Sequence, residues 1–177
     1  MSLQNKYSQC LKGNLDIGQR MTLSEEGVNL YIISSKHVDV YHVDNCIITS
    51  NNKRCDYMIY CKESTKFIEL KGIDIEHACD QIYYTICFFE NDEDLCEVVN
   101  NADYLMGYIA SLRPSVPAIT NIHMKKVCDK LFSKSRKKLE SLFDHLIFVR
   151  CVSKLSSNYL SNGKRQILVN NSHPLEV

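Results

Sequence analysis

Asp56, Glu69 and Lys71 are residues whose types and spacing suit chemistry on a phosphate ester. Asp56 stands at the head of an apolar run, and a second run ends in Glu69-Leu70-Lys71-Gly72. Strand side chains alternate between the two faces of a sheet, so Glu69 and Lys71 project to the same side. If the two runs form a hairpin, Asp56 comes opposite the end of the second strand, and two carboxylates and an ammonium group converge there.

Two neighbouring carboxylates provide oxygen ligands of the kind that Mg²⁺ takes from a protein, since this ion keeps several waters and also binds substrate phosphate. Mg²⁺ or Mn²⁺ held by Asp56 and Glu69 would polarise the scissile phosphate, lower the pKa of a bound water and offset charge on the leaving oxygen. Lys71 would orient the attacking water or balance the negative charge that develops on the phosphate. The three residues therefore predict metal-dependent hydrolysis of phosphodiester bonds.

The segments that carry these residues are typical of strands. Residues 54–61 and 65–71 are rich in β-favouring side chains, and the polar residues 62–64 between them can turn the chain back. Together with the extended segments before them, they predict an antiparallel meander over about residues 38–71.

Periodicity elsewhere along the chain predicts both helices and strands. Apolar residues recur at helical spacing after Gly72, and a Thr22-x-x-Glu25 capping box would open a short early helix. The chain is therefore expected to be α/β, with a central mixed β-sheet flanked by helices. The further expected elements are a strand at 28–34, a hairpin of 37–43 and 46–49 about Asp44-Asn45, a helix at 74–89, an acidic loop or short helix at 91–101, a strand at 104–112, a basic helix from Thr120 or Asn121 to about Arg136, a strand at 145–152 and a strand at 166–169.

The order of strand, turn, strand, Glu69-x-Lys71, glycine and helix resembles the PD-(D/E)xK nuclease superfamily, which has the restriction-endonuclease-like fold. The resemblance covers about residues 38–90, and the rest of the chain follows only in the order of its elements. In this resemblance Asp56 matches the first acid, Glu69 the second and Lys71 the lysine. It implies a Mg²⁺-dependent nuclease that acts on nucleic acid, with DNA as the expected substrate.

The resemblance also implies roles for three further groups. Gln81, on the helix after the motif, stands where some exonuclease-like branches carry a glutamine. Glu25 matches a glutamate that several branches place on an early helix near the metal. The alternative is that Glu25 is an ordinary solvent-exposed acid at the start of a helix, where the helix dipole favours a negative charge. The backbone carbonyl of Leu70 is expected as a third metal ligand beside Asp56 and Glu69.

Charge is unevenly distributed along a chain whose formal net charge is zero. Residues 1–112 hold 9 Lys/Arg and 17 Asp/Glu, whereas residues 113–177 hold 12 and 4, so the halves carry −8 and +8. A stripe along the predicted basic helix can neutralise several phosphates, which predicts nucleic-acid binding; a solvated amphipathic helix without a ligand is the alternative. The stripe consists of Lys126, Lys130, Lys134 and Lys137.

The length of 177 residues fits one domain, with the tail from about 155 to 177 at its periphery. The nine cysteines are odd in number and include no Cys-x-x-Cys pair, so we expect buried free thiols, with neither a disulfide nor a zinc site. No apolar stretch approaches the roughly 20 residues of a membrane span, and the start of the chain lacks an apolar signal core. We therefore expect a cytoplasmic protein without membrane contact.

Three functions from different classes stay open on the sequence. The first is the metal-dependent nuclease, and the second is a catalytically silent module of the same fold that binds nucleic acid or protein. The third is an interaction protein whose acidic and basic halves pair between subunits. A homodimer is compatible with the first function, although no feature of the sequence supports one.

Overall fold

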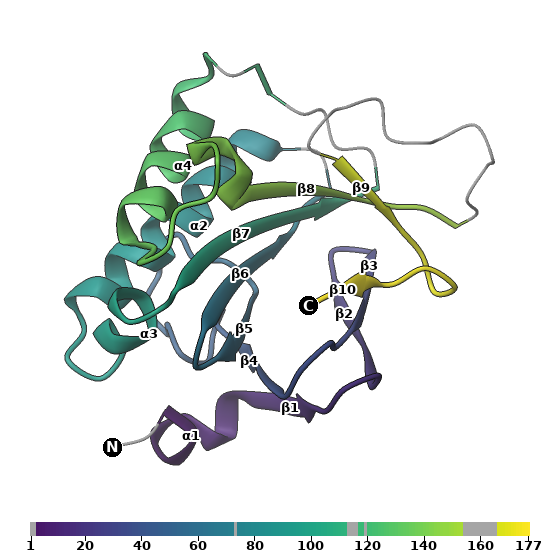
Figure 1. The fold of residues 1–177 in the computed structure, drawn as a ribbon, viewed down its shortest axis with the longest axis horizontal. Helices are drawn as coiled ribbons and strands as arrows, with labels where there is room; N and C mark the ends of the chain where they lie inside the picture. The colour runs from purple at the N-terminus through teal and green to yellow at the C-terminus, as the bar shows by residue number, and fades with distance from the viewer. Residues whose placement is uncertain (1–2, 73, 113–116, 119, 154–165) are drawn as a thin grey trace.

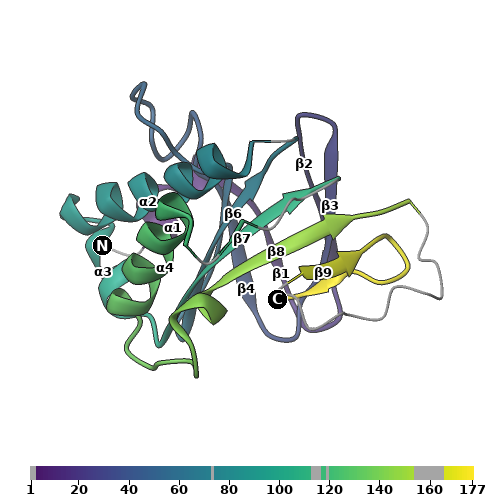
Figure 2. The same ribbon diagram turned by 90° about the horizontal axis from the view of Figure 1, so that it is seen from above.

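The computed structural model describes residues 3–72, 74–112, 117–118, 120–153 and 166–177, and it arranges them in three layers (Figure 1). A seven-stranded sheet forms the middle layer. Helices cover one face of this sheet, and a three-stranded sheet lies against the other face. Figure 2 shows the same layers from above, with the helices gathered on one side. The expected mixed α/β architecture is confirmed.

The large sheet has an antiparallel half and a parallel half. Its strands are β1 (Leu11–Leu15), β4 (Val38–His42), β5 (Tyr57–Cys61), β6 (Ser64–Leu70), β7 (Tyr104–Ser111), β8 (Leu146–Cys151) and β9 (Gln166–Val169), in the order β1-β4-β5-β6-β7-β8-β9. The strands from β1 to β6 pair antiparallel, and those from β6 to β9 pair parallel. The meander predicted for residues 38–71 is therefore present as β4, β5 and β6. The strand predicted for 145–152 is present as β8 and is not the last of the sheet.

The helices are the crossover connections that parallel strands require. α2 (Ile75–Asn91) connects β6 to β7, and α4 (Ile122–Lys134) lies between β7 and β8. Each begins at a side-chain cap: Asp74 accepts from the His77 amide, and Asn121 accepts from the amides of His123 and Met124. The shorter helical elements are α1 (Leu3–Lys6), η1 (Ser8–Cys10), α3 (Cys96–Asn100) and η2 (Leu142–His145).

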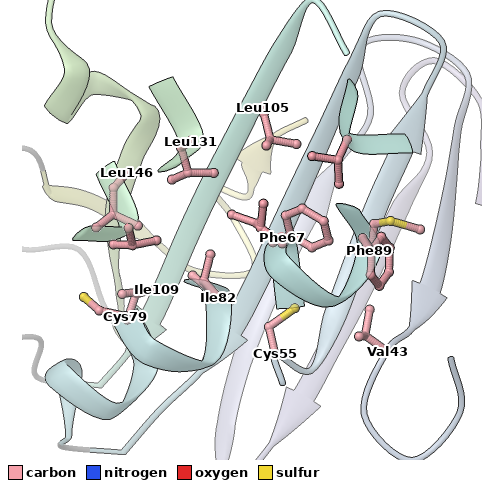
Figure 3. Packing of buried hydrophobic residues seen from close by; sticks show 14 of the residues in the cluster. Val43, Cys55, Phe67, Cys79, Ile82, Phe89, Leu105, Ile109, Leu131 and Leu146 are labelled. Carbon is pink, nitrogen blue, oxygen red and sulfur yellow. The ribbon is translucent and has the colours of Figure 1, made fainter. Parts of the chain in front are cut away.

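The core on the helix face is built from the apolar stripes of α2 and α4 and the side chains of β6 and β7 that face them (Figure 3). Phe67 meets Phe89 edge to face, with ring centroids 5.3 Å apart. Gly107 lets the helices approach β7 closely, because a Cβ there would come within 2.8 Å of Leu146 Cδ1 and 3.1 Å of Leu131 Cδ1. Full burial of each large apolar side chain stabilises the fold by about 1.5–3 kcal/mol.

The small sheet consists of β2 (Arg20–Glu25), β3 (Val28–Ile33) and β10 (Leu175–Glu176), in the order β10-β3-β2. It buries a second core against the large sheet. Glu26 and Gly27 connect β2 to β3 with positive φ angles of 47° and 77°, the conformation of a type I′ turn. The short helix predicted at Thr22 is therefore wrong, because the capping-box residues lie on a strand of this hairpin.

Two further expectations about local structure are wrong. Residues 46–49, expected as the second strand of a hairpin, are not a strand. They belong to a turn that contains a single bridge from Asp44 to Ile48. Cys46 in this turn forms a disulfide with Cys10 of η1, although no disulfide was expected. Of the other cysteines, the predicted buried thiols are found at Cys55, Cys61, Cys79 and Cys128, whereas Cys87 is partly exposed.

Residues 166–177 are part of both sheets and do not form a peripheral tail. The first part of the expected tail, 155–165, lies outside the described residues. After it, β9 pairs with β8 in the large sheet and β10 pairs with β3 in the small one. Leu175 and Val177 are buried between the sheets. In the part of the chain that is described, no helix combines the length and the apolar character that crossing a bilayer requires.

Candidate functional site

Asp56 and Glu69 lie side by side at the open end of the β5–β6 hairpin. Tyr57 pairs with Ile68, so one further step in the same register places Asp56 opposite Glu69. Residues that face each other across antiparallel strands project to the same side of the sheet. The Leu70 amide donates a 2.7 Å hydrogen bond to Asp56 Oδ2, which fixes this carboxylate against β6. The hairpin thus places the two acids on one face, as the sequence predicted.

That face is the one covered by α2. Glu69 lies two residues after Phe67 on β6, so both side chains project to the same face. Phe67 belongs to the core under the helices. The helix also holds the segment that leads into Asp56: Gln81 Nε2 donates to the Arg54 carbonyl at 2.9 Å, and Thr85 Oγ1 accepts from the Cys55 amide at 2.8 Å. Gln81 therefore contacts the backbone two residues before Asp56 and acts on its position.

Lys71 lies at the same end of β6, where its amide donates to the Ala110 carbonyl at 2.8 Å. Its ammonium group is 3.5 Å from Glu26 Oε1, in the turn between β2 and β3. Glu25, the acid named from the sequence, is one residue away at the end of β2, and its charge raises the pKa of Asp56. Glu26, and not Glu25, is therefore the acid in contact with Lys71. Glu26 was missed from the sequence because the pattern of this segment predicts a helix and not a hairpin turn.

Burial dominates the electrostatics of Asp56. It raises the pKa of this carboxyl from 3.8 to about 7, and the charges of Glu25 and Asp44 add to the rise. The Leu70 amide and the Lys71 ammonium group lower the pKa and offset part of the shift. Asp44 itself is held by the Arg54 guanidinium group. Asp56 therefore changes its charge near neutral pH.

Glu69 is buried more deeply, with 1% of its surface exposed. Burial raises the pKa of its carboxyl well above the ordinary value, the neighbouring Asp56 raises it further, and Lys71 lowers it. Among the described residues, Glu69 Oε2 has no hydrogen-bond partner. A buried carboxylate oxygen without a partner is costly and favours a bound proton or a cation at that position.

The residues present fit a small divalent cation with oxygen ligands. Asp56 and Glu69 offer two adjacent carboxylates, and Mg²⁺ commonly needs only one or two from the protein. Within the described ranges, no group of three or more His, Cys, Asp or Glu side chains is arranged to hold a metal. Water, a substrate phosphate or the Leu70 carbonyl would have to complete the coordination, and the role of that carbonyl stays a prediction.

Of the lysine stripe, Lys126, Lys130 and Lys134 lie on α4 and contact residues of α2, whereas Lys137 lies beyond the end of α4 and is exposed. Lys130 and Lys134 both pair with Glu90 of α2, and Lys137 pairs with Asp103 at 2.8 Å. Lys126 lies over the Tyr83 ring, 3.9 Å from its centroid. On the opposite side of α4, Met124, Val127, Cys128 and Leu131 are buried, and Phe132 is partly exposed. Three of the four lysines named for nucleic-acid binding therefore already have carboxylate partners.

Comparison of the chain with protein-family models, curated proteins and solved structures finds no match.

Proposed function

We propose that the protein is a metal-dependent nuclease of the PD-(D/E)xK superfamily that hydrolyses phosphodiester bonds in DNA. The observation that carries the proposal is the buried pair of Asp56 and Glu69, opposite each other on one sheet face, with Glu69 Oε2 lacking a partner among the described residues. The restriction-endonuclease-like fold is part of the proposal. The antiparallel β4-β5-β6 meander, the α2 crossover and parallel β7 support it.

The roles of the residues follow from their positions. Asp56 and Glu69 hold Mg²⁺ or Mn²⁺, which when bound supplies a Lewis acid and an acidified water. The Lys71 ammonium group, at the same end of β6, orients the attacking water and stabilises negative charge on the phosphate. Glu26 holds Lys71 in place, and Gln81 positions the segment before Asp56.

The direct test is cutting of plasmid, linear duplex and single-stranded DNA in Mg²⁺, with EDTA as the metal-free arm. Glu69→Gln and Lys71→Ala are each expected to lower the cutting rate by at least ~100-fold, because the first removes a metal ligand and the second removes the positive charge that acts on the reacting phosphate. Glu63→Gln and Lys62→Ala are matched controls in the turn at the other end of the hairpin. Equal cutting by Glu69→Gln and wild type would refute the assignment.

Thermal unfolding tests the metal site without relying on turnover. Mg²⁺ or Mn²⁺ is expected to raise the melting temperature of the wild type, because a ligand that binds only the folded state stabilises it. The same ions should not shift the melting temperature of Asp56→Asn combined with Glu69→Gln. An equal shift in both proteins would place the cation elsewhere.

A catalytically silent binding module is the second candidate, and the almost complete burial of Glu69 favours it. Such a module would bind nucleic acid in a salt-sensitive way without metal-dependent cutting of any of the DNA forms.

A further inference from the structure

A groove lies between the loop before β5 and α2. The groove encloses about 690 Å³, within the range of pockets for small ligands. Asn51, Asn52 and Lys53 line it from the loop, and Tyr84, Phe88 and Asn91 line it from α2. Cys87 and Asp92 also line it, so the groove combines aromatic rings, amide side chains, an ammonium group and a carboxylate.

Tyr84 is the most exposed aromatic side chain of the described residues, with 42% of its surface accessible. Two ammonium groups approach its ring, Lys126 Nζ at 4.8 Å and Lys53 Nζ at 5.7 Å from the centroid. Tyr83 supports the ring edge to face, with centroids 5.3 Å apart. An exposed ring with cations around it is the combination on which nucleobases stack while their phosphates are neutralised.

Two acids lie at or near the groove, and both accept hydrogen bonds. Asp80 accepts from Lys53 and lies beside His123, and Asp92 accepts from the amides of Asp94 and Leu95. Lys126, in contrast, has no carboxylate partner among the described residues and contacts only the two tyrosine rings. The amides of Asn51 and Asn52 add donors and acceptors that suit the polar edge of a base.

The groove is also close to the proposed catalytic pair. Lys53 precedes Asp56 by three residues, and three steps of 3.8 Å limit the distance between their Cα atoms to about 11 Å. Gln81 of α2 holds the Arg54 carbonyl between them. A strand that contacts Lys53 would therefore pass within about 11 Å of the Asp56 backbone.

We propose that this groove binds an unpaired nucleobase, with Tyr84 as the stacking surface and Lys53 and Lys126 as the phosphate contacts. The inference rests on the proposed nuclease function and names its substrate class, a single-stranded nucleic acid. The Lys126 ammonium group moves from the ring to the phosphate when the base enters, whereas Lys53 contacts the phosphate while it also holds Asp80. A paired base cannot enter, because its edge and both faces are occupied in the duplex.

The chain contains no tryptophan, so Tyr84→Trp introduces one fluorescent reporter that keeps an aromatic ring in the groove. Single-stranded oligothymidylate in EDTA is expected to quench its emission, whereas a duplex of equal length should not. Oligouridylate in place of oligothymidylate separates RNA from DNA. Tyr104→Trp is the matched control, because Tyr104 is also exposed and lies 6.0 Å from a lysine, Lys137, elsewhere on the surface.

Affinity measured without a reporter completes the test. Tyr84→Ala is expected to weaken binding of the single strand roughly tenfold or more, and Tyr84→Phe and Tyr104→Ala should bind as the wild type does. Unchanged affinity of Tyr84→Ala, or equal quenching at Tyr84→Trp and Tyr104→Trp, would overturn the inference. Because both measurements use EDTA, quenching without any cutting in Mg²⁺ refutes the nuclease alone, and duplex cutting without quenching refutes this groove alone.

Discussion

The carboxyl groups of Asp56 and Glu69 are buried, although carboxylates ordinarily remain in contact with water. Both are buried, both have raised pKa values, and one oxygen lacks a partner in the described structure. Two such groups side by side destabilise the folded chain unless a proton or a cation is bound between them. Residues held at this cost are commonly functional, which is the reason for assigning chemistry to this pair.

At the residue scale, the stability of the metal-free protein should depend on the ionisation of Asp56. Between pH 3.8 and about 7 the folded protein retains a proton that the unfolded chain has lost, so the free energy of unfolding falls as the pH rises through this window. The effect of Asp56 amounts to as much as about 4 kcal/mol above pH 7. Asp56→Asn should therefore be more stable than the wild type above pH 7 in EDTA.

Urea unfolding at a series of pH values measures this difference. The Asp56→Asn variant should keep a smaller slope of the same sign, because Glu69 titrates in the same direction. Identical slopes for the variant and the wild type would show that Asp56 is not a buried acid of raised pKa.

At the element scale, α2 connects the segment before Asp56, the groove at Tyr84 and two lysines of the stripe. Its middle turns hold the segment before Asp56 through Gln81 and Thr85, and its exposed side carries Tyr84. Its C-terminal half carries Glu90, which holds two lysines of α4. A change in this one helix therefore affects both the catalytic pair and the nucleic-acid contacts.

Glu90→Gln should release Lys130 and Lys134 from their carboxylate partner. We expect a loss of about 1 kcal/mol in the free energy of unfolding, together with tighter and more salt-sensitive binding of DNA. Asp129→Asn is the control, because it removes an exposed ion pair with Lys125 on the same helix. DNA affinity that does not change in Glu90→Gln would count against the lysine stripe as a binding surface.

The packing of helices on the sheet predicts a second effect at this scale. Gly107→Ala should destabilise the protein by about 1–3 kcal/mol, because the added methyl group meets Leu146 and Leu131 in a filled core. Gly72→Ala is the control, since a Cβ at Gly72 has no heavy atom within 4 Å. Thermal unfolding of both variants checks the prediction, and equal melting temperatures would contradict it.

At the scale of the whole molecule, the acidic and basic halves of the chain meet within one chain. The acidic segment of residues 74–103 contributes Glu90 and Asp103, and the basic helix region contributes their lysine partners. This pairing weakens the third function considered from the sequence, in which the halves join different subunits. A homodimer stays a prediction.

The Cys10–Cys46 disulfide joins the first residues to the turn before β5 and closes a loop with a sequence separation of 36. By loop entropy, its loss should lower the free energy of unfolding by about 3–4 kcal/mol. Urea unfolding of Cys10→Ser, and of the wild type with and without a reducing thiol, measures the loss, with Cys96→Ser as the control. An unchanged midpoint in reducing thiol would show that the bond is absent, as is usual for cytoplasmic proteins.

The elements that the sequence predicted are those whose signals are local. Asp74 and Asn121 cap α2 and α4, and the apolar periodicity within each helix defines its buried side. The β5–β6 hairpin also has its strands and its turn in one short segment, so the pairing of Asp56 with Glu69 follows from it. The β2–β3 hairpin was missed because Thr22 and Glu25 imitate a capping box, while the turn is determined by the positive φ angles of Glu26 and Gly27.

By itself, the sequence determined the hairpin that aligns the two acids, because alternation along neighbouring strands is a property of the local chain. Only the tertiary structure decided that Glu26 contacts Lys71, that Glu90 holds the lysine stripe, and that Tyr84 faces a groove. These contacts join segments far apart in the chain, and their geometry depends on how α2 and the small sheet pack against the two faces of the large sheet.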